Sequence, residues 1–188
     1  MTPAAILVVL AGLTLVAYTV GKHRALAVAG GSRGIRNLHS LPSYYGALTA
    51  LWCAIPALIV FALWIAFQDS ILTALVVANL PPQLQSLSPP ELGLALNDVR
   101  NVVAGNVPFE AARPEIQAAA TEFIQLRGTS RLALTGIVIA SGVLGIVVVR
   151  SRIAASLRAR NAVERIVEWG LIGCSLIAVL TTVGIIAS

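Results

Sequence analysis

The 188-residue sequence contains few charged and few aromatic residues. Asp, Glu, Lys and Arg together make up 11% of the chain and Phe, Trp and Tyr make up 5%, whereas 57% of the residues are hydrophobic. The mean hydropathy is +0.88, far above that of soluble domains. Disorder requires low hydrophobicity, and base-stacking surfaces require aromatic side chains. The composition therefore predicts an integral membrane protein that does not bind nucleic acid.

Cysteine and histidine are also scarce. Cys53 and Cys174 both lie inside apolar stretches, where neither a disulfide framework nor a zinc site has the ligands it needs. His23 and His39 have no Cys, Asp or Glu nearby in the sequence that would orient an imidazole for acid–base chemistry. We therefore expect no enzymatic activity, no metal site and no bound cofactor.

Four apolar stretches are each long enough to form a transmembrane helix, which takes about 20 residues. Glu168, at the start of the fourth stretch, is the single Asp, Glu, Lys, Arg or His residue within them, so the sequence offers no charge well inside a span of the kind that marks an ion or proton pathway. The spans cover approximately residues 4–20, 47–67, 132–149 and 166–187. The predicted fold is all-α, with four transmembrane helices.

The basic residues are concentrated in two connections, residues 21–46 and 150–165. These connections hold nine of the 13 Lys and Arg residues, whereas residues 68–131 carry four Arg against six Asp and Glu. Short loops rich in Lys and Arg stay in the cytoplasm. We therefore expect a multi-pass protein of a bacterial inner membrane, with both termini and residues 68–131 in the periplasm.

The same boundaries predict three parts of the chain. Residues 1–67 and 132–188 are each expected to form a two-helix membrane unit with a basic cytoplasmic loop, and residues 68–131 a periplasmic helical segment.

Within the periplasmic segment, apolar residues at helical spacing predict a small hairpin of two amphipathic helices. The first helix is expected to start at Ser88 or the following prolines, after turns at Leu80–Pro82, and to end at Gly105. The second is expected to open at Pro114 and to stop at Gly128.

The second basic connection predicts a contact with anionic lipid headgroups or, alternatively, with a cytoplasmic partner. Ile153 and Leu157 would share one side of a short helix, and the neighbouring arginines would reach the headgroups. These arginines are Arg150, Arg152, Arg158 and Arg160.

Charged pairs and small residues mark the start and the faces of the later spans. We expect ion pairs between Arg160 and Glu164 and between Arg165 and Glu168, at the start of the fourth span. Small residues also recur every four positions and predict close packing of helices within the protein. These sets are Gly136 with Ala140, Ser141 with Gly145, and Gly170 with Cys174 and Ala178.

Residues 38–46, with the sequence Leu-His-Ser-Leu-Pro-Ser-Tyr-Tyr-Gly, carry the most specific signal in the chain. This stretch resembles a signature in the N-terminal extension found in one branch of PstC-type permease subunits of bacterial phosphate ABC importers. The signature positions are His39, Pro42, Tyr44 and Gly46. Those permeases share the order of span, basic loop, span and periplasmic helical segment, and residues 164–188 resemble the first helix of their conserved core.

The resemblance implies a membrane-embedded part of a phosphate importer permease, with a role in assembly, docking or regulation. It implies as partners a second permease subunit, an ATPase subunit and a periplasmic phosphate-binding protein, besides membrane lipid. The family's E-A-A-x3-G coupling motif is not matched, because Glu110-Ala111-Ala112 is not followed by the required glycine. We therefore expect no transport path or ATP coupling from this chain alone. The alternative is a small accessory or scaffold subunit of another bacterial membrane complex.

Overall fold

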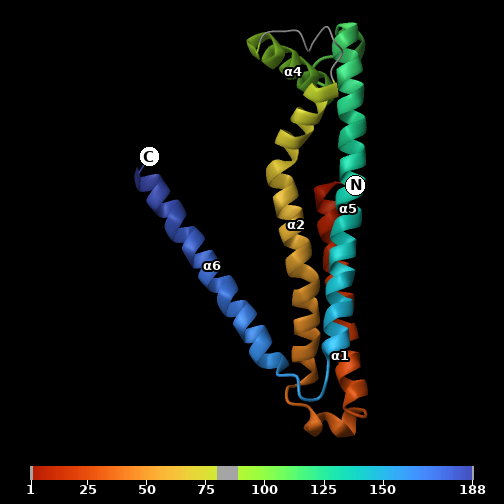
Figure 1. Ribbon diagram of the computed structural model, residues 1–188, viewed down its shortest axis with the longest axis vertical. Helices are drawn as coiled ribbons and strands as arrows, with labels where there is room; N and C mark the ends of the chain where they lie inside the picture. The colour runs from red at the N-terminus through yellow and green to blue at the C-terminus, as the bar shows by residue number, and fades with distance from the viewer. Residues whose placement is uncertain (1, 80–88, 188) are drawn as a thin grey trace. The chain divides into compact units, whose positions relative to one another are not determined.

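A computed structural model describes residues 2–79 and 89–187 of the chain. Within these ranges all regular elements are helical, and four of them, α1, α2, α5 and α6, are long and apolar enough to cross a membrane. The prediction of an all-α membrane protein with four transmembrane helices is confirmed. The elements shown in Figure 1 are α1 (Pro3–Val28), η1 (Ser32–Asn37), α2 (Pro42–Asn79), α4 (Pro89–Ala104), η2 (Phe109–Ala111), α5 (Pro114–Arg152) and α6 (Ala159–Ala187).

Local sequence signals explain where α1 begins and ends. The Thr2 hydroxyl accepts a hydrogen bond from the Ala5 N–H at 3.3 Å, and Pro3 occupies the first helical position, where its missing N–H costs nothing. At the other end Gly30 has φ +80°, and the Gly31 N–H donates to the Leu26 carbonyl at 2.9 Å. A glycine in the left-handed region is the common way to end a helix.

Helices α2 and α5 are longer than a membrane requires. With 38 and 39 residues they measure about 57 Å and 58 Å at 1.5 Å per residue, roughly twice the thickness of a hydrocarbon core. Each therefore contains a span together with an extension that projects beyond it. In α2 the extension follows the predicted span, and in α5 it precedes the predicted span.

The predicted helical hairpin differs from the structure at its second arm. The first arm is present as α4, which ends before Gly105 at φ +79°, although the predicted start at Ser88 and the turns at Leu80–Pro82 lie outside the described residues. The second arm does not stop at Gly128, because α5 runs without interruption from Pro114 to Arg152. Glycine costs a helix interior only about 1 kcal/mol. The packing of Ile116, Ala119 and Ala120 and the apolar span that follows outweigh this cost.

The chain forms two compact units. The first unit is Ile59–Val138, which contains the end of α2, all of α4 and the start of α5. Its core is a single apolar cluster to which all three helices contribute. The buried side chains of this cluster are Val76, Ala95, Val99, Val102, Ile116, Ala119 and Ala120. Burial of these side chains explains why α4, the most amphipathic helix, is stable in its position.

The second unit comprises Thr2–Leu58 and Ile139–Ser188. Its helices approach one another closely at glycines, because a glycine has no side chain to hold them apart. A Cβ atom on Gly46 would lie 2.8 Å from the Tyr18 carbonyl oxygen, and one on Gly145 would contact the backbone of Trp52. Gly145 therefore confirms the packing role predicted for its small-residue pair. Gly136 and Gly170 have no such neighbour within 4 Å, so the predicted close approach is absent at these two positions.

Candidate functional site

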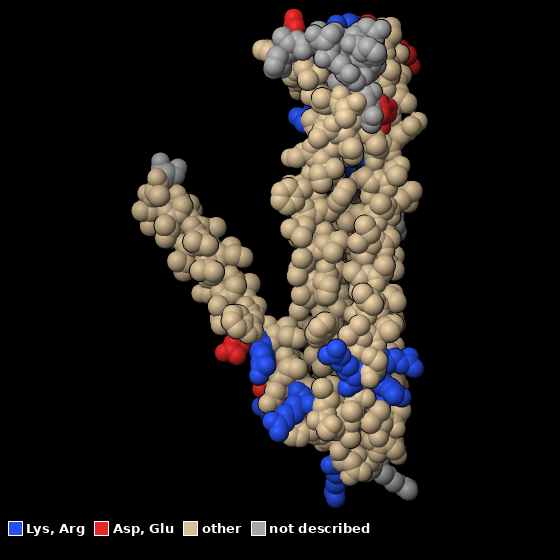
Figure 2. Space-filling view, in the orientation of Figure 1, with Lys and Arg blue, Asp and Glu red and all other residues tan. Residues whose placement is uncertain are grey.

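The basic residues gather around the connections of the second unit. On the face shown in Figure 2, Lys and Arg side chains cluster where α1 leads to α2 and where α5 leads to α6. Both connections belong to the same unit. The structure thus brings together two segments that are more than 100 residues apart in the sequence.

Hydrogen bonds join the two connections directly. The His39 N–H donates to the Ala155 carbonyl at 3.0 Å, and the Ser40 hydroxyl accepts from the Arg160 N–H at 3.2 Å. The Tyr45 hydroxyl donates to the Leu157 carbonyl at 2.9 Å. We call these contacts the connection clamp.

An apolar cluster packs against the residues of the connection clamp. Tyr45 is completely buried, and its ring packs among the buried side chains of both connections and of the adjoining helix ends. The buried members of this cluster are Ala25, Ala29, Leu38, Tyr45, Leu48, Val149, Ile153 and Ala159. The clamp is therefore a rigid junction of four long helices rather than a pair of solvated loops.

The short helix predicted around Ile153 and Leu157 is absent. The chain leaves α5 after Arg152 and enters α6 at Ala159 without an intervening helix. The physical reason is that the backbone carbonyls of Ala155 and Leu157 accept bonds from the first connection, while Ile153 is buried in the core. Tertiary contacts here replace the local hydrogen bonds that a short helix would make.

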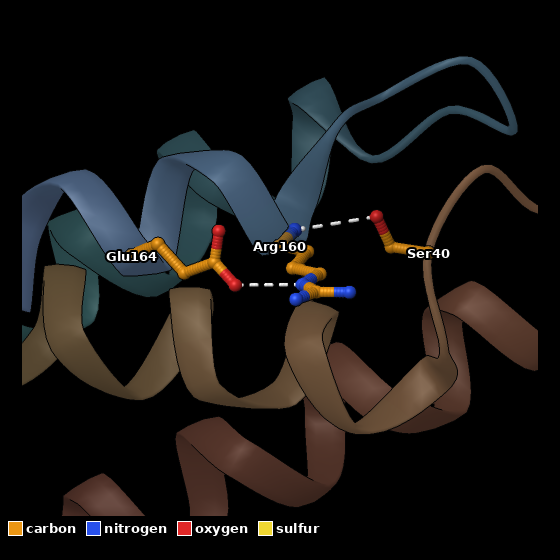
Figure 3. Close-up of polar contacts among 3 residues, drawn as sticks. All are labelled: Ser40, Arg160 and Glu164. Atoms are coloured by element: carbon orange, nitrogen blue, oxygen red, sulfur yellow. Dashed lines mark hydrogen bonds and ion pairs between the residues drawn. The ribbon is translucent and has the colours of Figure 1, made fainter.

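Arg160 is held by groups of its own unit. Its Nε donates to the Glu164 carboxylate at 2.6 Å, as Figure 3 shows, and its guanidinium lies 6.0 Å from the centre of the Tyr44 ring. The predicted Arg160–Glu164 ion pair is confirmed. The predicted pair between Arg165 and Glu168 is not formed in the part of the chain that the structure describes.

The other three arginines named from the sequence are exposed. Arg150 and Arg152 lie in the last turn of α5, and Arg158 lies in the connection. Arg150 lines a pocket of about 330 Å³ together with Thr19, His23 and Arg24 of α1. This grouping was not predictable from the sequence, because helical spacing within α1 does not indicate which residue of α5 lies beside it.

The four signature residues all lie at the junction formed by the connection clamp. Pro42 is buried at the first position of α2, Gly46 lies against Tyr18, and Tyr44 lies beneath the Arg160 guanidinium. The side chain of His39 is exposed, and its backbone N–H makes the clamp bond. The most specific stretch of the sequence therefore positions the connections.

Helix α6 presents apolar side chains along its whole length. None of the residues in its most hydrophobic window is buried, whereas the corresponding windows of the other three candidate spans are 17% to 28% buried. Near its start, α6 and α2 enclose an open groove of about 510 Å³. The groove is lined by Leu51, Trp52, Ile55, Pro56, Arg165, Ile166, Trp169 and Gly170.

The described residues hold no group of three His, Cys, Asp or Glu side chains that would bind a metal ion. Comparison with known proteins gives one assignment: a family model described as "Phosphate ATP-binding cassette transporter" matches residues 6–181. No curated protein and no solved structure matches the chain.

Proposed function

This chain belongs to the phosphate ATP-binding cassette transporter family, and from that membership we propose that it is a membrane-embedded part of a phosphate importer permease. Its role is in assembly, docking or regulation, and it contributes neither a transport path nor ATP coupling by itself. The observation that carries the proposal is the family match over residues 6–181, which spans all four candidate transmembrane helices.

The exposed surface of α6 supports a docking role. Side chains such as Leu176 and Ile177 are 58% and 63% exposed, and they lie in the middle of a 29-residue helix that the rest of the unit does not cover. Membrane helices associate through packing of complementary surfaces. In this proposal α6 and the groove beside α2 receive a second membrane subunit of the importer.

The distribution of charge supports an orientation in a bacterial inner membrane. With the basic connections in the cytoplasm, α4 and the projecting ends of α2 and α5 lie in the periplasm. In this proposal the basic connections face an ATPase subunit, and residues 68–131 face a periplasmic phosphate-binding protein. The pocket formed by His23, Arg24 and Arg150 is placed to receive anionic lipid headgroups of the inner leaflet.

The assembly role is tested by affinity purification of the tagged chain from its native membrane in a mild detergent. We expect a second permease subunit, an ATPase and a phosphate-binding protein to co-purify, as identified by mass spectrometry. Recovery of an unrelated complex without an ATPase would overturn the importer proposal and favour a scaffold subunit of that complex.

Docking of a second membrane subunit on α6 is tested by photo-crosslinking in the native membrane. A benzophenone amino acid at Leu176 in α6 is expected to crosslink to a membrane subunit. The matched control is the same probe at Leu15 of α1, which is 70% exposed but lies on a helix without a proposed docking surface. Equal crosslinking from both positions would contradict docking through α6.

A further inference from the structure

Pro56 interrupts the hydrogen bonding of α2 in the middle of its predicted span. It lies well inside this 38-residue helix. Because proline has no backbone N–H, it cannot donate to the carbonyl four residues earlier, which belongs to Trp52. The hydrocarbon core of a membrane offers no water that would take over this bond. The Trp52 carbonyl therefore lacks the donor that a regular helix would give it.

Gly145 of α5 lies against the same carbonyl. A Cβ atom on Gly145 would overlap the Trp52 carbonyl oxygen and would lie 3.2 Å from the Cys53 nitrogen. At such a contact a glycine offers its Cα–H groups, which are weaker hydrogen-bond donors than an N–H group. Helix α5 thus supports this turn of α2 from outside, but more weakly than an intact helical hydrogen bond would.

The preceding turns of α2 are held more firmly, by α1. A Cβ atom on Gly21 of α1 would lie 2.7 Å from the Tyr45 carbonyl oxygen, so the two helices touch at the level of their backbones. Tyr45 and Thr49 are completely buried, and the Thr49 hydroxyl donates to the Tyr45 carbonyl at 2.8 Å. The first turns of α2 are therefore fixed, in contrast to the turn that Pro56 weakens.

The packing of α2 also changes directly after Pro56. One compact unit contains α2 as far as Leu58, and the other begins at Ile59. Few contacts cross such a division. Sharp bends in helices occur mostly at prolines, and hinges consist of a few residues between segments that pack separately. We propose that the turn from Trp52 to Pro56 is a hinge at which α2 bends.

The hinge forms one wall of the groove between α2 and α6. Trp52, Ile55 and Pro56 line this groove from α2, and Trp169 and Gly170 line it from α6. A Cβ atom on Gly170 would meet no atom within 4 Å, so the opposite wall leaves room for movement. Bending at the hinge adjusts the width of the groove to its occupant. This consequence rests on the proposed function, which assigns the groove to a second membrane subunit.

The hinge is tested by hydrogen–deuterium exchange of the purified full-length chain in lipid nanodiscs. The amides of residues 57–60 follow the hinge directly, and they are expected to exchange about tenfold faster than those of residues 46–50. Residues 46–50 lie at the start of the predicted span, where water is nearer. A helix without a hinge would show the opposite order, because exchange is then fastest at the ends of the span.

Two proline substitutions separate the hinge from the general effect of removing a proline. Pro56→Ala supplies the missing N–H to the Trp52 carbonyl and is expected to slow exchange at residues 57–60 about tenfold, the effect of one net hydrogen bond. The matched control is Pro42→Ala, at the first position of α2, where the missing N–H costs nothing. It is expected to leave exchange at residues 57–60 unchanged. Circular dichroism verifies that both variants keep their helical content.

The effect on the groove is tested by disulfide crosslinking between its two walls. In a cysteine-free background, the pair Ile55→Cys and Gly170→Cys reports closing of the groove, because a disulfide needs Cα atoms within about 7 Å. Pro56→Ala is expected to slow this crosslink about tenfold. The control pair is Leu51→Cys and Ile166→Cys, which lines the same groove ahead of the hinge. Its rate is expected to stay unchanged.

The two measurements decide separate steps of the proposal. Exchange at residues 57–60 that is no faster than at residues 46–50, or that Pro56→Ala does not slow, would overturn the hinge. A crosslinking rate that Pro56→Ala leaves unchanged would overturn its link to the groove. Both experiments use the isolated chain, so failure of importer subunits to co-purify would remove the proposed occupant of the groove without affecting the hinge.

Discussion

The Ser40 hydroxyl accepts a hydrogen bond of 3.2 Å from the backbone N–H of Arg160, 120 residues later in the chain (Figure 3). The first N–H groups of a helix have no partner within the helix, and an adjacent side chain usually supplies one. At α6 the cap comes from a different connection. One side chain therefore both completes α6 and ties it to the start of α2.

Removal of this cap is expected to destabilise the second unit. Ser40→Ala leaves the Arg160 N–H without its acceptor and is expected to lower the free energy of unfolding by about 1 kcal/mol. Titration with sodium dodecyl sulfate in mixed micelles, followed by circular dichroism, measures the change. Ser156→Ala removes an exposed hydroxyl of the same connection and is expected to have no effect. An equal loss in both variants would show that Ser40 does not act as a cap.

The hydrogen bond of the Tyr45 hydroxyl is expected to stabilise the connection clamp. Tyr45→Phe retains the buried ring but removes the donor to the Leu157 carbonyl at 2.9 Å, and is expected to cost about 1 kcal/mol of unfolding free energy. The same titration measures the loss. Tyr44→Phe is the matched control, because its ring still lies beneath Arg160 and its hydroxyl makes no bond among the described residues. A smaller loss for Tyr45→Phe than for the control would contradict the clamp.

The close approach at Gly145 predicts a strong effect of a single methyl group. Gly145→Ala would place a Cβ atom against the Trp52 carbonyl, so the helices must separate at a cost of about 1–3 kcal/mol. Gly136→Ala in the same helix meets open space and is expected to be neutral or stabilising by up to about 1 kcal/mol. Thermal unfolding of the two variants measures the difference, and equal midpoints would refute the contact.

The proposed orientation is tested by labelling single cysteines with a membrane-impermeant maleimide in a Cys53→Ser, Cys174→Ser background. Ala118→Cys, in the exposed part of α5 beyond the span, is expected to react in cells with a permeabilised outer membrane and an intact inner membrane. Ser156→Cys, in the basic connection, is expected to react only after lysis of the inner membrane. The reverse pattern would invert the topology.

The sequence was sufficient to predict the spans and α4, because their apolar content and periodicity are local properties. The continuity of α5 through Gly128 was missed for a physical reason. A glycine is a strong stop only where the backbone turns left-handed, as at Gly30, and Gly128 keeps a helical conformation inside α5, whose start is packed in the buried cluster of its unit. Local chemistry does not reveal that packing.

The sites were harder to predict than the helices. Arg150, Arg24 and His23 share a pocket, as do Arg100, Arg127 and Asp69, yet each set comes from helices far apart in the sequence. The Arg160–Glu164 pair was predictable because its two members are one helical turn apart. Spacing within one helix thus identifies pairs, whereas groups that span helices depend on how those helices pack.

The two connections that form the connection clamp are translated at different times. Translation delivers His39, Ser40 and Tyr45 more than 100 residues before Ala155, Leu157 and Arg160, so the receiving half of the junction leaves the ribosome while the other half is still unmade. Helix α6 is made after α1, α2 and α5, so the Ser40 hydroxyl that accepts from its first turn is already present when α6 forms. The earlier connection thus acts as a template for the start of the later helix.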